Sequence, residues 1–233
     1  MEKIVIRGIE VLAAENQDAL IAYLQYRTGA LVAINAEKVI LCDEDPVLKR
    51  LITQAEFKYA DGISIVKAMQ QKKTQHRLAR IAGVDLWLAL LHARKGEPVF
   101  LVGAERDTLA KTYEKLTACG INIVGIQDGY FSAEEEAVII ERIKQSGASF
   151  VSVAMGSPKQ EIFIQRAKQQ HPNCLYMGVG GSYDVFIGKV KRAPQSWQEF
   201  GFEWLYRLLK QPTRWRRQLR LIKYAYYYVT KQL

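Results

Sequence analysis

Residues 150–170 read FVSVAMGSPKQEIFIQRAKQQ and hold the pattern that decides the fold. The run Phe150–Ala154 is short, mostly apolar and followed after Met155 by a glycine, which is typical of a strand buried on both faces. From Pro158 to Gln170 the apolar residues recur at helical spacing. Ser157 is predicted to cap this helix and Pro158 to occupy its first position. A buried strand that leads directly into a helix is the building unit of a parallel sheet.

The same pattern recurs along most of the chain. Helical spacing is found at Asp85–Arg94, Asp107–Ala118 and Ala133–Gln145. We therefore predict an α/β fold, with a Rossmann-like, mostly parallel sheet and helices on both of its faces. The other candidate strands are Lys3–Ile6, Leu31–Ile34, Phe57–Ala60, Val99–Val102, Ile121–Val124 and Leu175–Val179.

The C-terminal part differs in charge and in aromatic content. From Lys189 onward there are 11 basic and 2 acidic residues, which accounts for the whole net charge of +9. Trp215, Leu219, Ile222 and Tyr226 follow each other at helical spacing and predict an amphipathic helix. We predict an α/β catalytic domain over residues 1–194 and a basic, aromatic-rich, helical appendage over residues 195–233. Such a one-sided basic segment indicates an anionic partner.

Several classes of protein are disfavoured by composition. No apolar stretch approaches the ~20 residues of a membrane span, and the N-terminus has no signal-peptide pattern, so we expect a cytoplasmic protein. The three histidines have no metal-ligand spacing, and we predict neither a metal site nor a cofactor. Cys42, Cys119 and Cys174 are an odd number without a redox or metal motif, and we expect buried, reduced thiols.

Polar and glycine-rich clusters follow most of the candidate strands. Because the carboxyl ends of parallel strands meet at one edge of a sheet, and ligands bind there, these clusters predict a binding site. The clusters are Asn35–Lys38, Asp61–Ser64, Gln127–Tyr130, Gly156–Gln160 and Gly178–Asp184.

Taken singly, each cluster has two interpretations. Asp61-Gly62 is typical of a turn, but a carboxylate at a strand end can also act as a general base. Asp128-Gly129-Tyr130 is either a turn or a display of an aromatic ring on which a base stacks. Gly178–Gly181 is either a tight turn or a loop whose backbone N–H groups approach a phosphate. The local sequence leaves these alternatives open.

Taken in order, however, the clusters resemble one family over nearly the whole chain, that of the WecG/TagA/CpsF glycosyltransferases. Leu31–Lys38, Phe57–Ser64, Tyr176–Phe186 and Glu203–Leu209 resemble, within it, the members that transfer N-acetyl-D-mannosaminuronate in enterobacterial common antigen synthesis. The motifs that carry the family resemblance are Asn35-Ala36-Glu37, Ala60-Asp61-Gly62, Gly83-Val84-Asp85-Leu86, Phe100-Leu101-Val102-Gly103, Asp128-Gly129-Tyr130-Phe131, Gly156-Ser157-Pro158-Lys159-Gln160-Glu161, Gly178-Val179-Gly180-Gly181 and Arg192-Ala193-Pro194.

The resemblance also implies roles for individual residues. Asp61 matches the catalytic base, and Gln160 and Arg80 match residues of the active-site pocket. Tyr130 matches the aromatic residue that stacks on uracil, and Asp184 matches a nucleoside contact. Arg207, Arg214 and Arg217 match appendage arginines that close over the pyrophosphate. We expect the remaining substrate-binding residues to be Asn35, Ser64, Gly129, Gly178, Gly180 and Gly181.

The implied reaction is inverting transfer from a UDP-sugar donor to a lipid-pyrophosphate sugar acceptor, undecaprenyl-pyrophosphate-linked N-acetylglucosamine. The expected location is peripheral, on the inner face of the inner membrane, with the appendage on the anionic membrane surface. No nucleic-acid partner is expected, and the oligomeric state is left open.

Three alternatives accompany this prediction. A same-family transferase that uses UDP-N-acetylmannosamine is the first; a relative that acts on this uncharged sugar carries Thr where this chain has Ala33, and the smaller side chain could admit the uronate carboxylate. The basic, aromatic tail taken alone is compatible with nucleic-acid binding. An oxidoreductase or epimerase would need a dinucleotide fingerprint, which Ile6-Arg7-Gly8-Ile9-Glu10 does not provide.

Overall fold

The computed structural model describes residues 1–72, 77–194, 197, 206 and 215–233. Within them the strands are β1 Lys3–Ile6, β2 Ile9–Leu12, β3 Gly29–Ile34, β4 Phe57–Ala60, β5 Val99–Gly103, β6 Ile123–Gln127, β7 Phe150–Ala154 and β8 Leu175–Gly178. The helices are α1 Gln17–Leu24, α2 Ala36–Glu44, α3 Pro46–Gln54, α4 Ile63–Gln70, α5 Gly83–Ala93, α6 Arg106–Ala118, α7 Ala133–Gln145, α8 Lys159–Gln170, α9 Ser182–Phe186 and α12 Trp215–Val229.

The strands form one sheet in the order β1-β2-β4-β3-β8-β7-β5-β6. Every neighbouring pair is parallel except β1–β2, which is antiparallel. The predicted α/β fold with a mostly parallel sheet is thereby confirmed. Because the parallel strands point the same way, the loops after β4, β3, β8, β7, β5 and β6 lie along one edge, called here the carboxyl rim.

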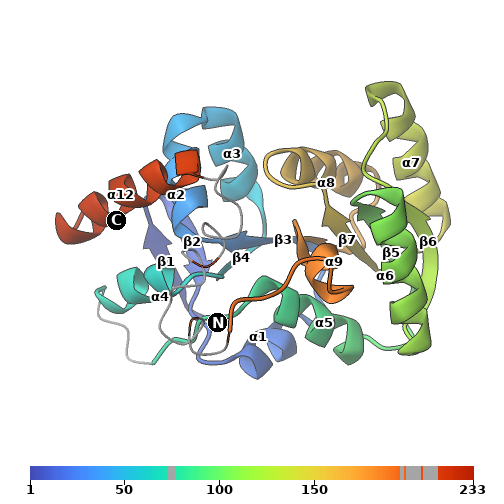
Figure 1. Cartoon of the computed structure of the whole chain (residues 1–233), viewed down its shortest axis with the longest axis horizontal. Coiled ribbons are helices and arrows are strands. Elements are labelled where there is room, and N and C mark those ends of the chain that lie inside the picture. The colour runs from blue at the N-terminus through green and yellow to red at the C-terminus, as the bar shows by residue number, and fades with distance from the viewer. Residues whose placement is uncertain (73–76, 195–196, 198–205, 207–214) are drawn as a thin grey trace.

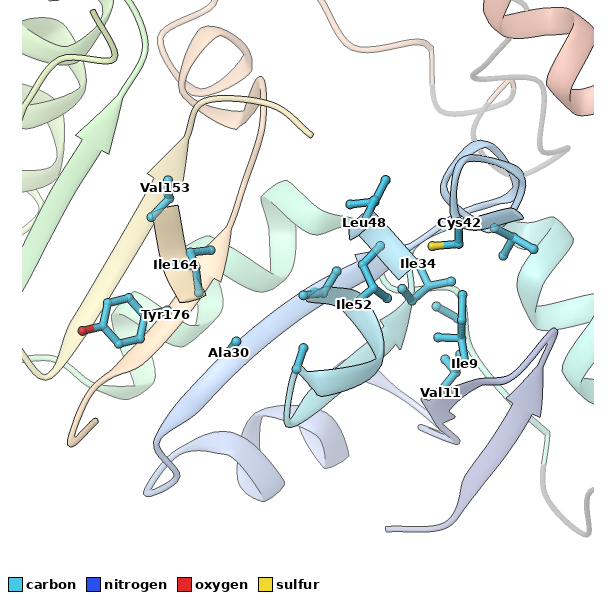
Figure 2. Close-up of a cluster of buried hydrophobic side chains, with 14 of the residues drawn as sticks. Ile9, Val11, Ala30, Ile34, Cys42, Leu48, Ile52, Val153, Ile164 and Tyr176 are labelled. Atoms are coloured by element: carbon cyan, nitrogen blue, oxygen red, sulfur yellow. The ribbon is translucent and has the colours of Figure 1, made fainter. Parts of the chain in front are cut away.

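Helices cover both faces of the sheet, as predicted (Figure 1). Figure 2 shows part of the larger core, which runs from Ile9 and Val11 on β2 to Val153 on β7 and Tyr176 on β8. Helices α2, α3, α4, α7, α8 and α12 contribute to this core, and α1, α5, α6 and α9 to the core on the other face. Two buried layers of apolar side chains explain why the strands read as continuous apolar runs.

The N-terminal hairpin is a feature that the strand pattern missed. Arg7 (φ 49°) and Gly8 (φ 80°) form a two-residue turn with both residues left-handed, which fits the twist of β1 and β2. The predicted strand at Ile121–Val124 is displaced, since β6 begins at Ile123.

Two smaller predictions were wrong. Helix α8 begins at Lys159, so Pro158 precedes it instead of occupying its first position, and no side chain caps this end; the Ser157–Pro158 peptide is cis. Cys119 is exposed because α6 ends there and the chain turns at Gly120, whereas Cys42 and Cys174 are buried. Burial raises the pKa of Cys42 to about 11 and that of Cys174 to about 12.

Helix α12 packs beside α2 and the N-terminal hairpin (Figure 1). The Tyr224 side chain is buried and its hydroxyl donates to the Ser64 carbonyl oxygen at 3.0 Å. Arg220 pairs with Glu44 at 2.9 Å, and the Arg7 guanidinium lies 4.2 Å from the centre of the Tyr227 ring. One face of α12 is therefore anchored on the body of the protein.

The opposite face of α12 is apolar and turned outward. Ile222, Tyr226 and Val229 are 68%, 59% and 78% exposed. These three residues recur at helical spacing. Ile222 and Tyr226 belong to the predicted apolar stripe, and the side chains of its other two members, Trp215 and Leu219, lie outside the described part of the chain. In the described ranges, none of the helices has both the length and the low charge that crossing a bilayer would need.

Candidate active site

The carboxyl rim gathers the polar clusters in the order of the strands. Asp61 follows β4, Asn35 follows the adjacent β3, and Gly180 follows β8, the next strand along. With strands ~4.8 Å apart, Asp61 and the β8 glycines are about 10 Å apart along the sheet. Tyr130 follows β6, at the far end of the rim, so five strand spacings separate it from Asp61. The rim thus has two ends, one with the carboxylate and one with the exposed ring.

Asn35, Asp61 and Ser64 converge at the carboxylate end. Ile34 pairs with Ala60 in the sheet, and the Asp61 N–H donates to the Ile34 carbonyl oxygen at 2.9 Å. Asn35 caps α2 by accepting the Lys38 N–H at 2.9 Å. A Cβ on Gly62, the residue after Asp61, would lie 3.4 Å from Ser64 Oγ and 3.6 Å from Asn35 Cβ, so these two side chains lie close to this glycine.

The Asp61 carboxylate is half-buried and is held by the segment that leads into α5. The Gly83 N–H donates to Asp61 Oδ1 at 2.9 Å, and the Ile81 N–H donates to the Ala60 carbonyl oxygen at 3.1 Å. These two bonds place Arg80 in the backbone segment beside Asp61. Burial, reinforced by the Asp61 charge, raises the pKa of Tyr59 well above its usual value. The Asp61 carboxylate therefore lies at the carboxyl end of the buried strand β4, next to the segment that leads into α5.

Gln160 lies under the glycine loop after β8. Its Oε1 accepts the Gly180 N–H at 3.1 Å, and its Nε2 donates to Glu161 Oε1 at 3.1 Å. A Cβ on Gly178 would lie 2.7 Å from Gln160 Nε2, so any side chain there would displace this amide. Sequence reasoning placed Gln160, Gly178 and Gly180 in one site, and the structure brings them into contact.

Glu161 and Lys38 were not among the predicted site residues. Lys38 Nζ lies 2.8 Å from Glu161 Oε1, and both side chains are buried. Burial alone would raise the pKa of the Glu161 carboxyl, but the Lys38 ammonium and the hydrogen bonds to the carboxylate outweigh it and hold the pKa below its usual range. One signal in the sequence could have identified this pair. Lys38 is a charged residue among apolar residues of α2 that are buried: Ala36, Val39 and Ile40.

At the far end of the rim, Asp128–Tyr130 combines a turn with an exposed aromatic side chain. The Tyr130 N–H donates to Asp128 Oδ1 at 3.0 Å, and the Gly129 N–H donates to the Ala104 carbonyl oxygen at 2.9 Å, so the segment is a turn. The same turn leaves Tyr130 76% exposed. It therefore displays an aromatic ring at the rim.

Asp184, at the start of α9, already has protein partners. Its Oδ1 accepts the Thr108 hydroxyl at 3.3 Å and lies 3.6 Å from Lys189 Nζ. Gly181 precedes α9 in the same loop. Of the predicted appendage arginines, Arg207 and Arg214 lie outside the described residues, and Arg217 lies in α12 with its side chain outside them.

Two other features lie away from the rim. A hollow of about 300 Å³ between α3 and α8 is lined by Glu161 together with apolar residues such as Val32 and Ile164. Asp43-Glu44-Asp45 has the spacing of an acidic metal-binding triplet, but it lies one helix length from Asn35. Asp43 pairs with Arg7 at 2.8 Å and Asp45 caps α3. We place the candidate site at the rim, where the polar side chains converge.

One comparison with known proteins bears on this site. The model of the family described as "Glycosyl transferase WecG/TagA/CpsF family" matches residues 5–233, which is nearly the whole chain. The match includes every strand end that forms the carboxyl rim.

Proposed function

The chain belongs to the WecG/TagA/CpsF family of glycosyltransferases, and on that premise we propose that it transfers N-acetyl-D-mannosaminuronate from its UDP-sugar to undecaprenyl-pyrophosphate-linked N-acetylglucosamine. The proposal includes inversion at the anomeric carbon and a place in enterobacterial common antigen synthesis. The observation that carries it is the convergence of Asn35, Asp61 and Ser64 about two strand spacings from the Gly178–Gly181 loop.

In this proposal Asp61 is the general base. The acceptor hydroxyl oxygen attacks the anomeric carbon while the bond from that carbon to the UDP oxygen breaks, and Asp61 takes the hydroxyl proton. The hydrogen bond from Gly83 fixes the orientation of the carboxylate before the acceptor arrives. A positioned base avoids the cost of orienting it during the reaction.

The donor lies along the rim, with uracil towards Tyr130 and the sugar towards Asp61. Negative charge grows on the leaving pyrophosphate, and guanidinium groups stabilise it because their planar fork binds two phosphate oxygens at once. We assign this role to Arg80 and to the appendage residues Arg207, Arg214 and Arg217. The Gly180 N–H is engaged by Gln160, so it shapes the loop instead of binding phosphate. Asp184 would contact the nucleoside while remaining paired with Lys189.

The direct test is an assay of UDP release, with vesicles that carry the lipid-linked acceptor. UDP-N-acetylmannosaminuronate should be turned over, and UDP-N-acetylmannosamine should be a much poorer donor. The reverse preference would correct the sugar and would draw attention to Ala33, which lies on β3 beside Asn35. Absence of UDP release from either donor, together with steeply salt-dependent RNA binding, would contradict the proposal.

Replacing Tyr130 with alanine should weaken UDP binding. Loss of base stacking is worth about 1–3 kcal/mol, or roughly 5- to 150-fold in Kd. Calorimetric titration with UDP measures this effect, and Tyr26→Ala is the matched control, because Tyr26 is 84% exposed and precedes β3, at the opposite edge of the sheet. Equal losses in the two variants would remove Tyr130 from the nucleotide site.

The appendage, residues 195–233, is proposed to hold the enzyme at the inner face of the membrane. The support is the outward apolar face of α12, formed by Ile222, Tyr226 and Val229, on a helix whose other face is anchored through Tyr224. Aromatic and apolar side chains flanked by cations favour the interface of an anionic bilayer.

Replacing Ile222, Tyr226 and Val229 together with serine should reduce binding to anionic vesicles by about a hundredfold, which corresponds to roughly 3 kcal/mol of lost apolar burial. Vesicle co-sedimentation measures the change. The control replaces Val47 and Val138, each 62% exposed on other helices, with serine. If the triple variant and the control bind equally, this face of α12 is not the membrane contact.

A further inference from the structure

Lys38 and Glu161 form a buried ion pair that the proposed reaction does not use. Their side chains are 9% and 3% exposed and join the first turn of α2 to the first turn of α8, with 2.8 Å between Nζ and Oε1. Stability alone is a weak reason for such a pair, because well-packed apolar side chains of similar volume often serve equally well. Its position under Gln160 suggests another role.

The pair determines which way the Gln160 amide points. An ionised carboxylate only accepts hydrogen bonds and a backbone N–H only donates. Glu161 Oε1 on one side therefore requires Gln160 Nε2, and the Gly180 N–H on the other side requires Gln160 Oε1. The reverse orientation would set the amide oxygen against a carboxylate and the NH₂ against an N–H. Lys38 maintains this arrangement because it keeps Glu161 ionised despite burial.

The amide in turn shapes the loop after β8. Gln160 fills the space above Gly178, where a Cβ would lie 2.7 Å from Nε2, and it binds the N–H of Gly180, whose φ is +52°. This hydrogen bond restrains the left-handed backbone of the loop at Gly180. The loop is thereby tied to α8 and, through the ion pair, to α2, whose cap Asn35 stands beside Asp61.

We propose that Lys38 and Glu161 are positioning residues that fix the Gln160 amide and, through it, the Gly178–Gly181 loop against which the donor pyrophosphate binds. The last part rests on the proposed function, because only that function places the donor at this loop. The pair itself touches no substrate.

The decisive experiment reverses the charges, with Lys38→Glu and Glu161→Lys combined. The ion pair and the summed length of the two side chains are kept, but an ammonium now faces Gln160 and requires its Oε1. The amide then turns its NH₂ towards the Gly180 N–H, which loses its acceptor. A purely structural pair predicts that the double variant recovers what either single variant loses. The positioning role predicts that it recovers melting temperature without recovering activity.

Two measurements are made on the full chain. We expect kcat/KM for UDP-sugar turnover to fall by about a hundredfold, as is typical when catalytic geometry is displaced by an ångström. We expect amide exchange at Gly180, followed by NMR, to accelerate by about five- to tenfold, because its N–H loses the hydrogen-bond acceptor. Native turnover together with native Gly180 protection in the charge-reversed variant would overturn the proposal.

A second variant covers the case in which the charge-reversed chain does not fold. Lys38→Met with Glu161→Met keeps the volume, removes both charges and leaves Gln160 without an orienting partner on that side. Gly180 protection should again fall, whereas unchanged protection and turnover would overturn the proposal. The exchange readout needs no turnover: if the native chain releases no UDP but Gly180 responds as expected, the proposed function fails and the positioning of the amide stands.

Discussion

Asp61→Asn should lower kcat by about 10²–10⁴-fold, the usual contribution of a general base, while the melting temperature and the KM for the donor change little. The change removes the proton acceptor and keeps the shape of the side chain. UDP release at saturating donor and acceptor measures it. Of the changes considered, this one is expected to have the largest effect on turnover.

The choice of asparagine follows from the second role of this side chain. Asp61 Oδ1 accepts the Gly83 N–H at 2.9 Å and thereby holds the start of α5 against the rim. An amide oxygen can keep this bond, whereas alanine would leave the Gly83 N–H without its acceptor and confuse a loss of base with a loss of structure. Asp61→Ala should therefore lower the melting temperature as well as the activity.

Asp45→Asn is the matched control. Asp45 Oδ1 also accepts backbone N–H groups, those of Val47 and Leu48, and Asn caps a helix as well as Asp does. Asp45 lies at the far end of α2, about 13 Å from the rim at 1.5 Å per residue. The control should keep native turnover. If Asp61→Asn also keeps it, Asp61 is not the base, and the reaction needs another acceptor for the proton.

The sequence predicted the sheet well because the physical signal there is local. Buried parallel strands are covered on both faces and read as continuous apolar runs, so Phe57–Ala60 and Phe150–Ala154 were predicted with their observed bounds. β2 was missed because only one side of Ile9–Leu12 is consistently buried, and because Arg7-Gly8 is not one of the common hairpin dipeptides.

The candidate site was only partly predictable because its contacts are distant in sequence. Gln160 meets the Gly180 loop, and Lys38 meets Glu161 across 123 residues, only because β3, β8 and β7 are neighbours in the sheet. No single segment of the sequence determines the order of the strands in the sheet. The hydrogen bond from Tyr224 to Ser64 links the appendage to the Asp61 end of the rim. It joins residues 160 positions apart and could not be predicted from local sequence either.

The two Asp-Gly segments also show what local sequence could not predict. Local sequence presented a turn and a functional residue as alternatives at Asp61 and at Asp128. At Asp128 the turn is itself the device that exposes Tyr130. At Asp61 the next residue, Gly62, is the extended N-cap of α4, and the Asp61 carboxylate accepts the N–H of Gly83, which is 22 residues away. Only the geometry distinguishes the side chains that make structural hydrogen bonds from those that remain exposed.

The rim also depends on one close approach between strands, which gives the largest expected effect on stability. Gly103 ends β5 with φ +107°, and a Cβ there would lie 2.5 Å from the carbonyl carbon and oxygen of Ala154 on β7. These are backbone atoms, so they cannot move aside as a side chain could. The contact lets the Ala104 N–H reach the Ala154 carbonyl oxygen at 2.9 Å, and the Ala104 carbonyl oxygen then accepts the Gly129 N–H.

Gly103→Ala should therefore lower the free energy of unfolding by about 3–5 kcal/mol, the sum of left-handed backbone strain and displacement of two packed strands. Gly96→Ala is the matched control, because Gly96 has φ +94° but nothing within 4 Å of its Cβ position, so it should lose only the backbone part, about 1–2 kcal/mol. Denaturant unfolding of both variants measures the difference. Since the displaced contact supports the turn that exposes Tyr130, Gly103→Ala should also weaken UDP binding, whereas Gly96→Ala should not. Equal destabilisation by the two changes would mean that β5 and β7 can separate at the rim without cost, and the rim would then not be the rigid platform that the proposed reaction requires.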